Sequence, residues 1–168
     1  LPTDCPSRER AAWLCDSFFI CRVEPDLTGG NAVERNFIEG FALPQSFAPL
    51  PSGMLPKCYP ADSDPSGFLP TWAMWFVLQL EEYLQRSGDQ DLINALRDRV
   101  TELFAYFQPF RNEIGLLEKL AGVPFIEWSK ANEFVQDVSF PANMLYAAAL
   151  DAAGRLYGMA DLSRQAQS

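Results

Sequence analysis

Apolar side chains recur every three or four positions along most of the chain, and this spacing predicts α-helices. Glycine and proline interrupt the pattern between the helical stretches, as at Gly29, Gly30 and Pro109. We therefore predict an all-α fold with about five helices and a short terminal one. The expected helices are 8–23, 31–42, 71–86, 91–107 and one that Pro141 opens and Gly158 ends, followed by a short helix near Asp161.

Polar residues at the ends of these stretches predict how the helices begin and end. Asp4 or Ser7 can cap the first helix, which Pro25 and the Gly29-Gly30 pair would close, and Asp89 and Asp161 can cap later ones. The side chains expected to pack on one face of helix 8–23 are Ala12, Cys15, Phe19 and Val23.

Two long connections separate the helices. Residues 44–70 contain seven prolines and no periodic stripe, and residues 112–138 have a mixed pattern in which 125–128 is a short strand or a loop. Residues 86–92 and 157–162 form a weak repeat, in which Gly joins a helix end to a new helix. Such short connections predict antiparallel αα-hairpins. A site is expected on the side of the long loops.

The amino-acid composition limits the partners and the kinds of catalysis that are possible for this chain. The 168 residues suit a single domain, and 48% are apolar, without a run long enough to span a membrane. A net charge of −9 argues against a nucleic-acid partner. The sequence contains no histidine, which excludes Ser-His-Asp and Cys-His catalysis and makes a transition-metal site improbable. Any catalysis must use carboxylates, Tyr, Lys or Cys.

The four cysteines, at positions 5, 15, 21 and 58, lack the spacing of a paired zinc motif. Cys15 and Cys21 are expected to be buried thiols. No metal or other cofactor is predicted.

Residues 4–16 concentrate ionisable groups at the start of the chain. Asp4, Glu9 and Asp16 accompany Arg8 and Trp13 within thirteen positions. If the helix has formed by Glu9, then Glu9, Trp13 and Asp16 share one face; if it starts later, Glu9 lies at its mouth beside Asp4. Two carboxylates in different environments can act as acid and base. The alternative is a capped helix with ordinary surface ion pairs.

Aromatic residues in and beside the long connections suit a carbohydrate cleft. Trp72 follows the first connection and Trp128 lies in the second, while Trp75 is more consistent with core packing. Glu127 is either a ligand-binding carboxylate or a solvated one.

Asp4-Cys5-Pro6, followed by an arginine, Glu9, Trp13 and Asp16, resembles the signature of bacterial α-L-rhamnosidases, which are inverting glycosidases of the six-hairpin, (α/α)6 toroid class. Further landmarks extend the resemblance along nearly the whole chain: 70–72, 83–89, 125–129 and 143–146. The resemblance implies that residues 1–168 form a single partial domain, about half of the toroid.

The resemblance also implies roles and a substrate. Glu9 would be the general acid, and the residues expected to bind a rhamnose-containing carbohydrate are Asp4, Arg8, Trp13, Asp16, Trp72, Glu127 and Trp128. The general base would come from a glutamate beyond the chain.

We therefore expect a fragment of an inverting rhamnosidase, inactive alone, whose exposed half-barrel surface favours a homodimer. The sequence starts at Leu1 rather than Met, so a preceding segment is expected to be missing. The sequence does not decide whether the protein belongs to the bacterial cytoplasm or to the periplasm. Two alternatives remain: another six-hairpin sugar hydrolase, such as an unsaturated glucuronyl hydrolase, and a non-catalytic helical-repeat interaction module.

Overall fold

The computed structural model describes residues 2–5, 7–60, 67–128 and 138–167. Of these residues 59% are helical and none belongs to a strand, which confirms the all-α prediction. None of the helices described is long and apolar enough to cross a bilayer. In chain order the elements are α1 (Leu14–Thr28), α2 (Ala32–Ala42), α3 (Pro70–Ser87), α4 (Gln90–Ala95), α5 (Arg97–Phe107), the short 3₁₀-helix η1 (Gln108–Phe110), α6 (Phe140–Tyr157) and α7 (Ala160–Ala166).

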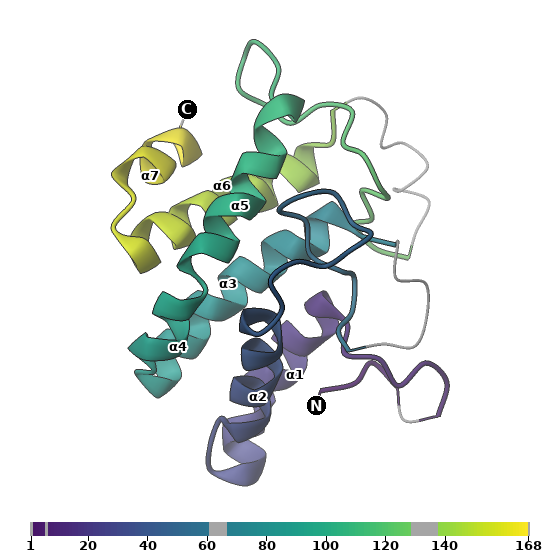
Figure 1. Cartoon of the computed structure of the whole chain (residues 1–168), viewed down its shortest axis with the longest axis vertical. Coiled ribbons are helices and arrows are strands. Elements are labelled where there is room, and N and C mark those ends of the chain that lie inside the picture. The colour runs from purple at the N-terminus through teal and green to yellow at the C-terminus, as the bar shows by residue number, and fades with distance from the viewer. Residues whose placement is uncertain (1, 6, 61–66, 129–137, 168) are drawn as a thin grey trace.

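The central helix is α3, which packs against α1 and α6, while α2 packs on α1 and α7 packs on α6 (Figure 1). Gly88 follows α3 and Gly158 follows α6, and both adopt left-handed conformations, with φ of 69° and 66°. Each therefore ends its helix and reverses the chain into the next one. This arrangement agrees with the predicted αα-hairpins.

The first helix differs from the prediction at both ends. It begins at Leu14 instead of Arg8, because the backbone of the preceding residues pairs with the long loop: Leu14 N donates to Lys57 O at 3.0 Å, and Tyr59 N donates to Ala12 O at 3.1 Å. Neither Asp4 nor Ser7 caps it, since Trp13 occupies the N-cap without a side-chain bond.

Other predicted helix ends also need correction. Pro25 lies inside α1, whereas Gly29, the other residue expected to close this helix, is its C-cap with a left-handed φ of 77°. The expected helix 91–107 divides at Leu96, which is both the C-cap of α4 and the N-cap of α5. Asp89 caps α4 as predicted by accepting from Leu92 N, but the N-cap of α7 is Met159 rather than Asp161.

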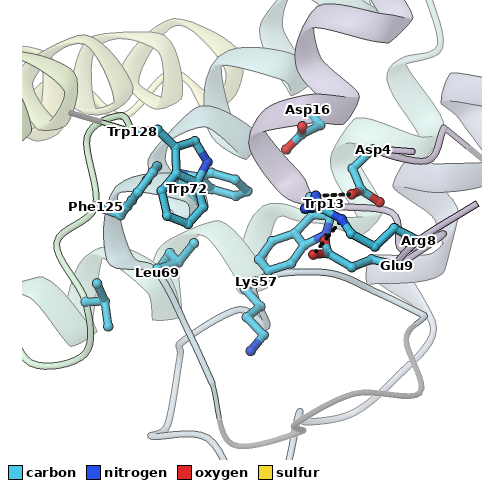
Figure 2. A pocket seen from close by; sticks show the side chains of 11 residues that line it. Asp4, Arg8, Glu9, Trp13, Asp16, Lys57, Leu69, Trp72, Phe125 and Trp128 are labelled. Carbon is cyan, nitrogen blue, oxygen red and sulfur yellow. Dashed lines mark hydrogen bonds and ion pairs between the residues drawn. The ribbon is translucent and has the colours of Figure 1, made fainter. Parts of the chain in front are cut away.

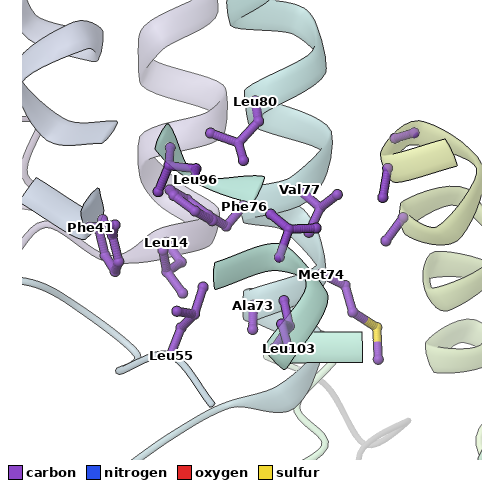
Figure 3. Packing of buried hydrophobic residues seen from close by; sticks show 14 of the residues in the cluster. Leu14, Phe41, Leu55, Ala73, Met74, Phe76, Val77, Leu80, Leu96 and Leu103 are labelled. Carbon is purple, nitrogen blue, oxygen red and sulfur yellow. The ribbon is translucent and has the colours of Figure 1, made fainter. Parts of the chain in front are cut away.

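The apolar core lies between α1, α3 and the helices around them (Figure 3). The face of α1 that packs on it contains Leu14, Phe18 and Cys21. Phe19 and Val23, expected to be buried, are instead 49% and 51% exposed, because α1 packs through the neighbouring face that contains Phe18 and Cys21. Helix α1 thus has apolar side chains on two sides, and only one of them is covered by the residues described.

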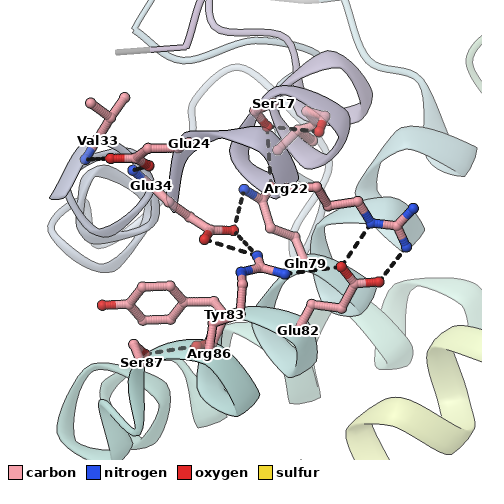
Figure 4. Close-up of polar contacts among 11 residues, drawn as sticks. Ser17, Arg22, Glu24, Val33, Glu34, Gln79, Glu82, Tyr83, Arg86 and Ser87 are labelled. Carbon is pink, nitrogen blue, oxygen red and sulfur yellow. Dashed lines mark hydrogen bonds and ion pairs between the residues drawn. The ribbon is translucent and has the colours of Figure 1, made fainter. Parts of the chain in front are cut away.

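Buried polar side chains join α1, α2 and α3 (Figure 4). Glu34 is fully buried, and its two carboxylate oxygens lie 2.8 and 2.9 Å from the same Nη2 of Arg86. Gln79 donates to Glu34 at 3.2 Å and accepts from Ser17 at 3.1 Å. The Glu24 carboxylate caps α2 by accepting from two backbone N–H groups of its first turn, at 2.7 and 2.8 Å.

The proline-rich connection before α3 is packed against the helices. Met54, Leu55 and Cys58 are buried. Gly53 has a φ of +82°, and a Cβ there would lie 2.2 Å from the Glu102 carbonyl oxygen. A glycine is therefore needed where the loop meets α5, and this contact fixes the position from which the loop approaches the start of α1.

Candidate active site

Residues 4, 5 and 7–13 precede α1, and among them Asp4 pairs with Ala11. The Asp4 N–H donates to Ala11 O at 3.1 Å, and Asp4 Oδ1 accepts from Ala11 N at 3.2 Å. Arg10, which comes just before Ala11, has a left-handed φ of 51°. The sequence allowed Glu9 to lie either within the first helix or before its start beside Asp4. The structure places Glu9 before the start of α1.

Glu9 is held by groups close to it in the sequence (Figure 2). Its Oε2 accepts from Trp13 Nε1 at 3.1 Å, and its backbone N–H donates to Cys5 Sγ at 3.0 Å. Arg8 lies 3.4 Å from Glu9 Oε1 and 3.9 Å from Asp4 Oδ2. One guanidinium therefore lies between the two carboxylates and offsets their mutual repulsion.

A pocket of about 420 Å³ opens beside these residues. Seven of the eight predicted site residues line it, and Glu127 does not; Glu127 is solvent-exposed. The lining residues are Asp4, Arg8, Glu9, Trp13, Asp16, Lys57, Leu69, Trp72, Val123, Phe125 and Trp128.

Aromatic rings form one wall of the pocket. Trp13 and Trp72 meet edge to face with centroids 5.3 Å apart, Trp72 and Phe125 are 5.9 Å apart, and Phe125 and Trp128 are 5.0 Å apart. Thr71 Oγ1 donates to Phe125 O at 2.6 Å and so ties the second connection to α3. The wall ends at Trp128, which is 94% exposed. Trp75 instead contacts Phe18 and Phe19 on α1 and is half-buried outside the apolar core, so the core-packing prediction for it is not met.

Sequence reasoning missed four lining residues: Lys57, Leu69, Val123 and Phe125. The ammonium of Lys57 lies 5.7 Å from the centroid of the Trp13 ring, within cation–π range. The length of the proline-rich loop pointed to a functional segment, but no pattern within it singled out Lys57. Phe125 belongs to a segment whose pattern was compatible with either a strand or a loop.

Two carboxyls of the pocket differ in acidity. Burial raises the pKa of Asp4, but hydrogen bonds from the Cys5 side chain and the Ala11 backbone outweigh it, so the pKa is below its usual value. The pKa of Asp16 is raised, first by burial and then by the negative charges of Asp4 and Glu9. The pocket thus combines a strongly ionised carboxylate with one that holds a proton more readily. Among the residues described, no group of three or more His, Cys, Asp or Glu side chains could hold a metal ion.

Replacing Asp16 by Asn is expected to stabilise the chain at neutral pH while impairing the pocket. The raised pKa means that the folded state disfavours the Asp16 carboxylate, and the amide removes this cost. We expect the substitution to raise the free energy of unfolding by about 0.5–2 kcal/mol, as measured by urea denaturation at pH 7. The gain should disappear as pH falls below the Asp pKa of the unfolded chain, about 3.9, where Asp16 is protonated in both states. A loss of stability in Asp16→Asn at pH 7 would contradict this.

Comparisons with known proteins agree with this arrangement. The family model described as the bacterial alpha-L-rhamnosidase 6 hairpin glycosidase domain matches residues 1–166. The structure is similar to that of a GH78 family rhamnosidase of Bacillus sp. GL1, with a TM-score of 0.78 and 19% sequence identity over 98% of this chain, which shows a shared fold. The chain spans 16% of the length of that protein. No curated protein matches the sequence. The chain belongs to the bacterial α-L-rhamnosidase six-hairpin glycosidase domain family.

Proposed function

We propose that this chain supplies the general acid and one side of the rhamnose pocket of an inverting α-L-rhamnosidase. The observation that carries the proposal is the pocket itself: three carboxylates and an aromatic wall meet in a chain of the rhamnosidase domain family. Carboxylates accept hydrogen bonds from sugar hydroxyls, while aromatic faces pack against sugar C–H groups. The ligand would be a rhamnose-containing glycan or glycoside.

In this proposal Glu9 donates its proton to the glycosidic oxygen as the bond to C1 of rhamnose breaks. The Trp13 hydrogen bond fixes the orientation of the Glu9 carboxyl group. Asp4 and Asp16 bind sugar hydroxyls beside it, with Arg8, Trp72 and Trp128 lining the same pocket. Water then attacks C1 from the opposite face and gives its proton to a second carboxylate, which releases rhamnose of inverted configuration.

The water-activating base must lie about 6.5–9.5 Å from the acid. We propose that it comes from a glutamate outside residues 1–168, so that these residues form part of one six-hairpin domain and are inactive alone. The exposed apolar side of α1, which includes Phe19, Val23 and Leu27, is consistent with cover by further hairpins. The homodimer expected from the sequence stays a prediction.

The proposal is tested by hydrolysis of p-nitrophenyl α-L-rhamnoside with the longer protein that contains this chain. We expect turnover, with β-L-rhamnose as the first product by proton NMR, and no turnover by residues 1–168 alone. First release of the α-anomer would contradict the inverting mechanism. Activity on another aryl glycoside or an unsaturated glucuronide, but not on the rhamnoside, would favour a different six-hairpin hydrolase. A protein inert on the whole panel would favour an interaction module.

A further inference from the structure

The pocket has two sides of different chemistry, and the roles proposed above use mainly one of them. Its three carboxylates gather at one side, whereas Leu69 and Phe125 lie at the opposite side (Figure 2). Val123 also lines the pocket and is joined to Phe125, whose backbone N–H donates to Val123 O at 2.7 Å. We call Leu69, Val123 and Phe125 the apolar half of the pocket.

Contacts between two distant chain segments hold the apolar half together. Leu69 directly precedes α3, and Thr71 in the first turn of that helix donates to Phe125 O at 2.6 Å. Gly122 has a φ of +81°, and a Cβ there would lie 2.6 Å from the Phe68 ring. A larger residue at position 122 would therefore push the second connection away from the residues that precede α3.

The apolar half offers few groups to bind a sugar. Its three side chains have no hydrogen-bonding atoms, and each of its backbone carbonyls already accepts a hydrogen bond within the chain. Leu69 O accepts from Trp72 N at 2.9 Å, and the other two carbonyls accept from Phe125 N and Thr71 Oγ1. A sugar hydroxyl placed here would lose its hydrogen bonds to water without equivalent replacement, whereas an apolar ring would bury hydrocarbon surface. Val123 is 57% exposed and so has surface left to cover.

The acid candidate lies between the carboxylates and the apolar half. Glu9 accepts from the Trp13 indole, and the Trp13 ring meets Trp72 edge to face at 5.3 Å. A glycosidic oxygen that receives a proton from Glu9 has rhamnose on one side and the leaving group on the other. Because the carboxylates suit the rhamnose hydroxyls, the leaving group extends toward the apolar half. The pocket volume of about 420 Å³ is in the range that holds drug-sized ligands, which are larger than one deoxyhexose.

We propose that Leu69, Val123 and Phe125 form the leaving-group subsite of this pocket and select an apolar ring there over a second sugar. The three residues thereby determine specificity for the part of the substrate that departs. The place of the leaving group rests on the proposed rhamnosidase function. The preference of this surface for an apolar ring does not require turnover and can be tested separately.

The first test is a titration of the 168-residue chain with benzyl alcohol and with methyl β-D-glucoside, followed by ¹H–¹⁵N NMR. Benzyl alcohol represents an apolar leaving group and the glucoside represents a second sugar. We expect benzyl alcohol to shift the Trp72 indole N–H and the Val123 amide with a millimolar Kd. The glucoside should bind at these residues at least about threefold more weakly, because its hydroxyls find few partners there.

Val123→Thr keeps the shape of the side chain and replaces one methyl by a hydroxyl. It should weaken the binding of benzyl alcohol by about two- to threefold, since part of the apolar contact is lost. The matched control is Val33→Thr, the same change at an exposed position outside the pocket, which should not alter binding. The proposal fails if benzyl alcohol shifts neither Trp72 nor Val123, if the glucoside binds there as tightly, or if Val123→Thr has no effect.

The second test compares kcat/KM of the longer protein for benzyl α-L-rhamnoside and for a rhamnosyl-glucose disaccharide, both of which release an alcohol. Val123→Thr should lower the benzyl value by about three- to tenfold, less than a methylene contact in a closed pocket would give, because Val123 is partly exposed. The disaccharide value should change by less than about twofold. Equal losses on both substrates would contradict the proposal. If the unmodified protein cleaves neither rhamnoside, the proposed function fails, and the NMR titration still decides what the apolar half binds.

Discussion

Replacing Glu9 by Gln in the longer protein is expected to lower kcat by about 10²–10⁴-fold for rhamnosides whose leaving group is a poor one, such as an alkyl alcohol. Gln has nearly the same size and can keep a hydrogen-bond acceptor for Trp13 Nε1, so the pocket should retain its shape. It cannot supply a proton to the departing oxygen. The loss should therefore appear in kcat rather than in KM.

The leaving group distinguishes an acid from a merely structural residue. An activated aryl leaving group departs with little protonation, so Glu9→Gln should impair its hydrolysis far less than that of an alkyl rhamnoside. The matched control is Glu113→Gln, which makes the same chemical change at an exposed position outside the pocket and should leave both rates unchanged. Equal losses for both leaving groups would assign Glu9 to binding or folding instead of proton transfer.

The sequence predicted the helices best where local signals agree. The α3 helix combines an apolar stripe with Pro70 at its start and Gly88 after its end, and its predicted limits are within one residue of those observed. The start of α1 could not be predicted in this way, because Ala12 bonds to Tyr59, forty-seven residues along the chain. That tertiary contact outweighs a locally helical pattern.

The residues of the site also fall into those that a local motif predicts and those that only tertiary contacts bring together. Asp4, Glu9, Trp13 and Asp16 lie within thirteen positions, so one motif identified them. Lys57 comes from a distant loop whose approach depends on packed contacts such as that of Gly53, which no short motif shows. The two chain segments that complete the aromatic wall were predicted only in part, since Trp72 and Trp128 were expected there and Phe125 was not.

Replacing Arg86 by Met should lower the free energy of unfolding by about 3–5 kcal/mol, which is typical when one partner of a buried ion pair is removed. Burial raises the pKa of Glu34, against the opposing hydrogen bonds of Arg86 and Gln79. Without Arg86, the fully buried carboxylate keeps Gln79 but loses its cation. Urea denaturation of the 168-residue chain at pH 7 measures the loss.

Two further comparisons test whether the loss of stability in Arg86→Met comes from the uncompensated charge of Glu34. Because a neutral Glu34 costs less to bury, the deficit of Arg86→Met should shrink as pH falls and the folded state takes up a proton at Glu34. Combining Arg86→Met with Glu34→Gln should recover part of the stability at pH 7. The matched control is Arg35→Met, which removes an arginine whose side chain is 50% exposed and should cost at most about 1 kcal/mol. A deficit that is independent of pH and unchanged by Glu34→Gln would assign the effect to lost packing of the Arg86 side chain rather than to an uncompensated buried charge.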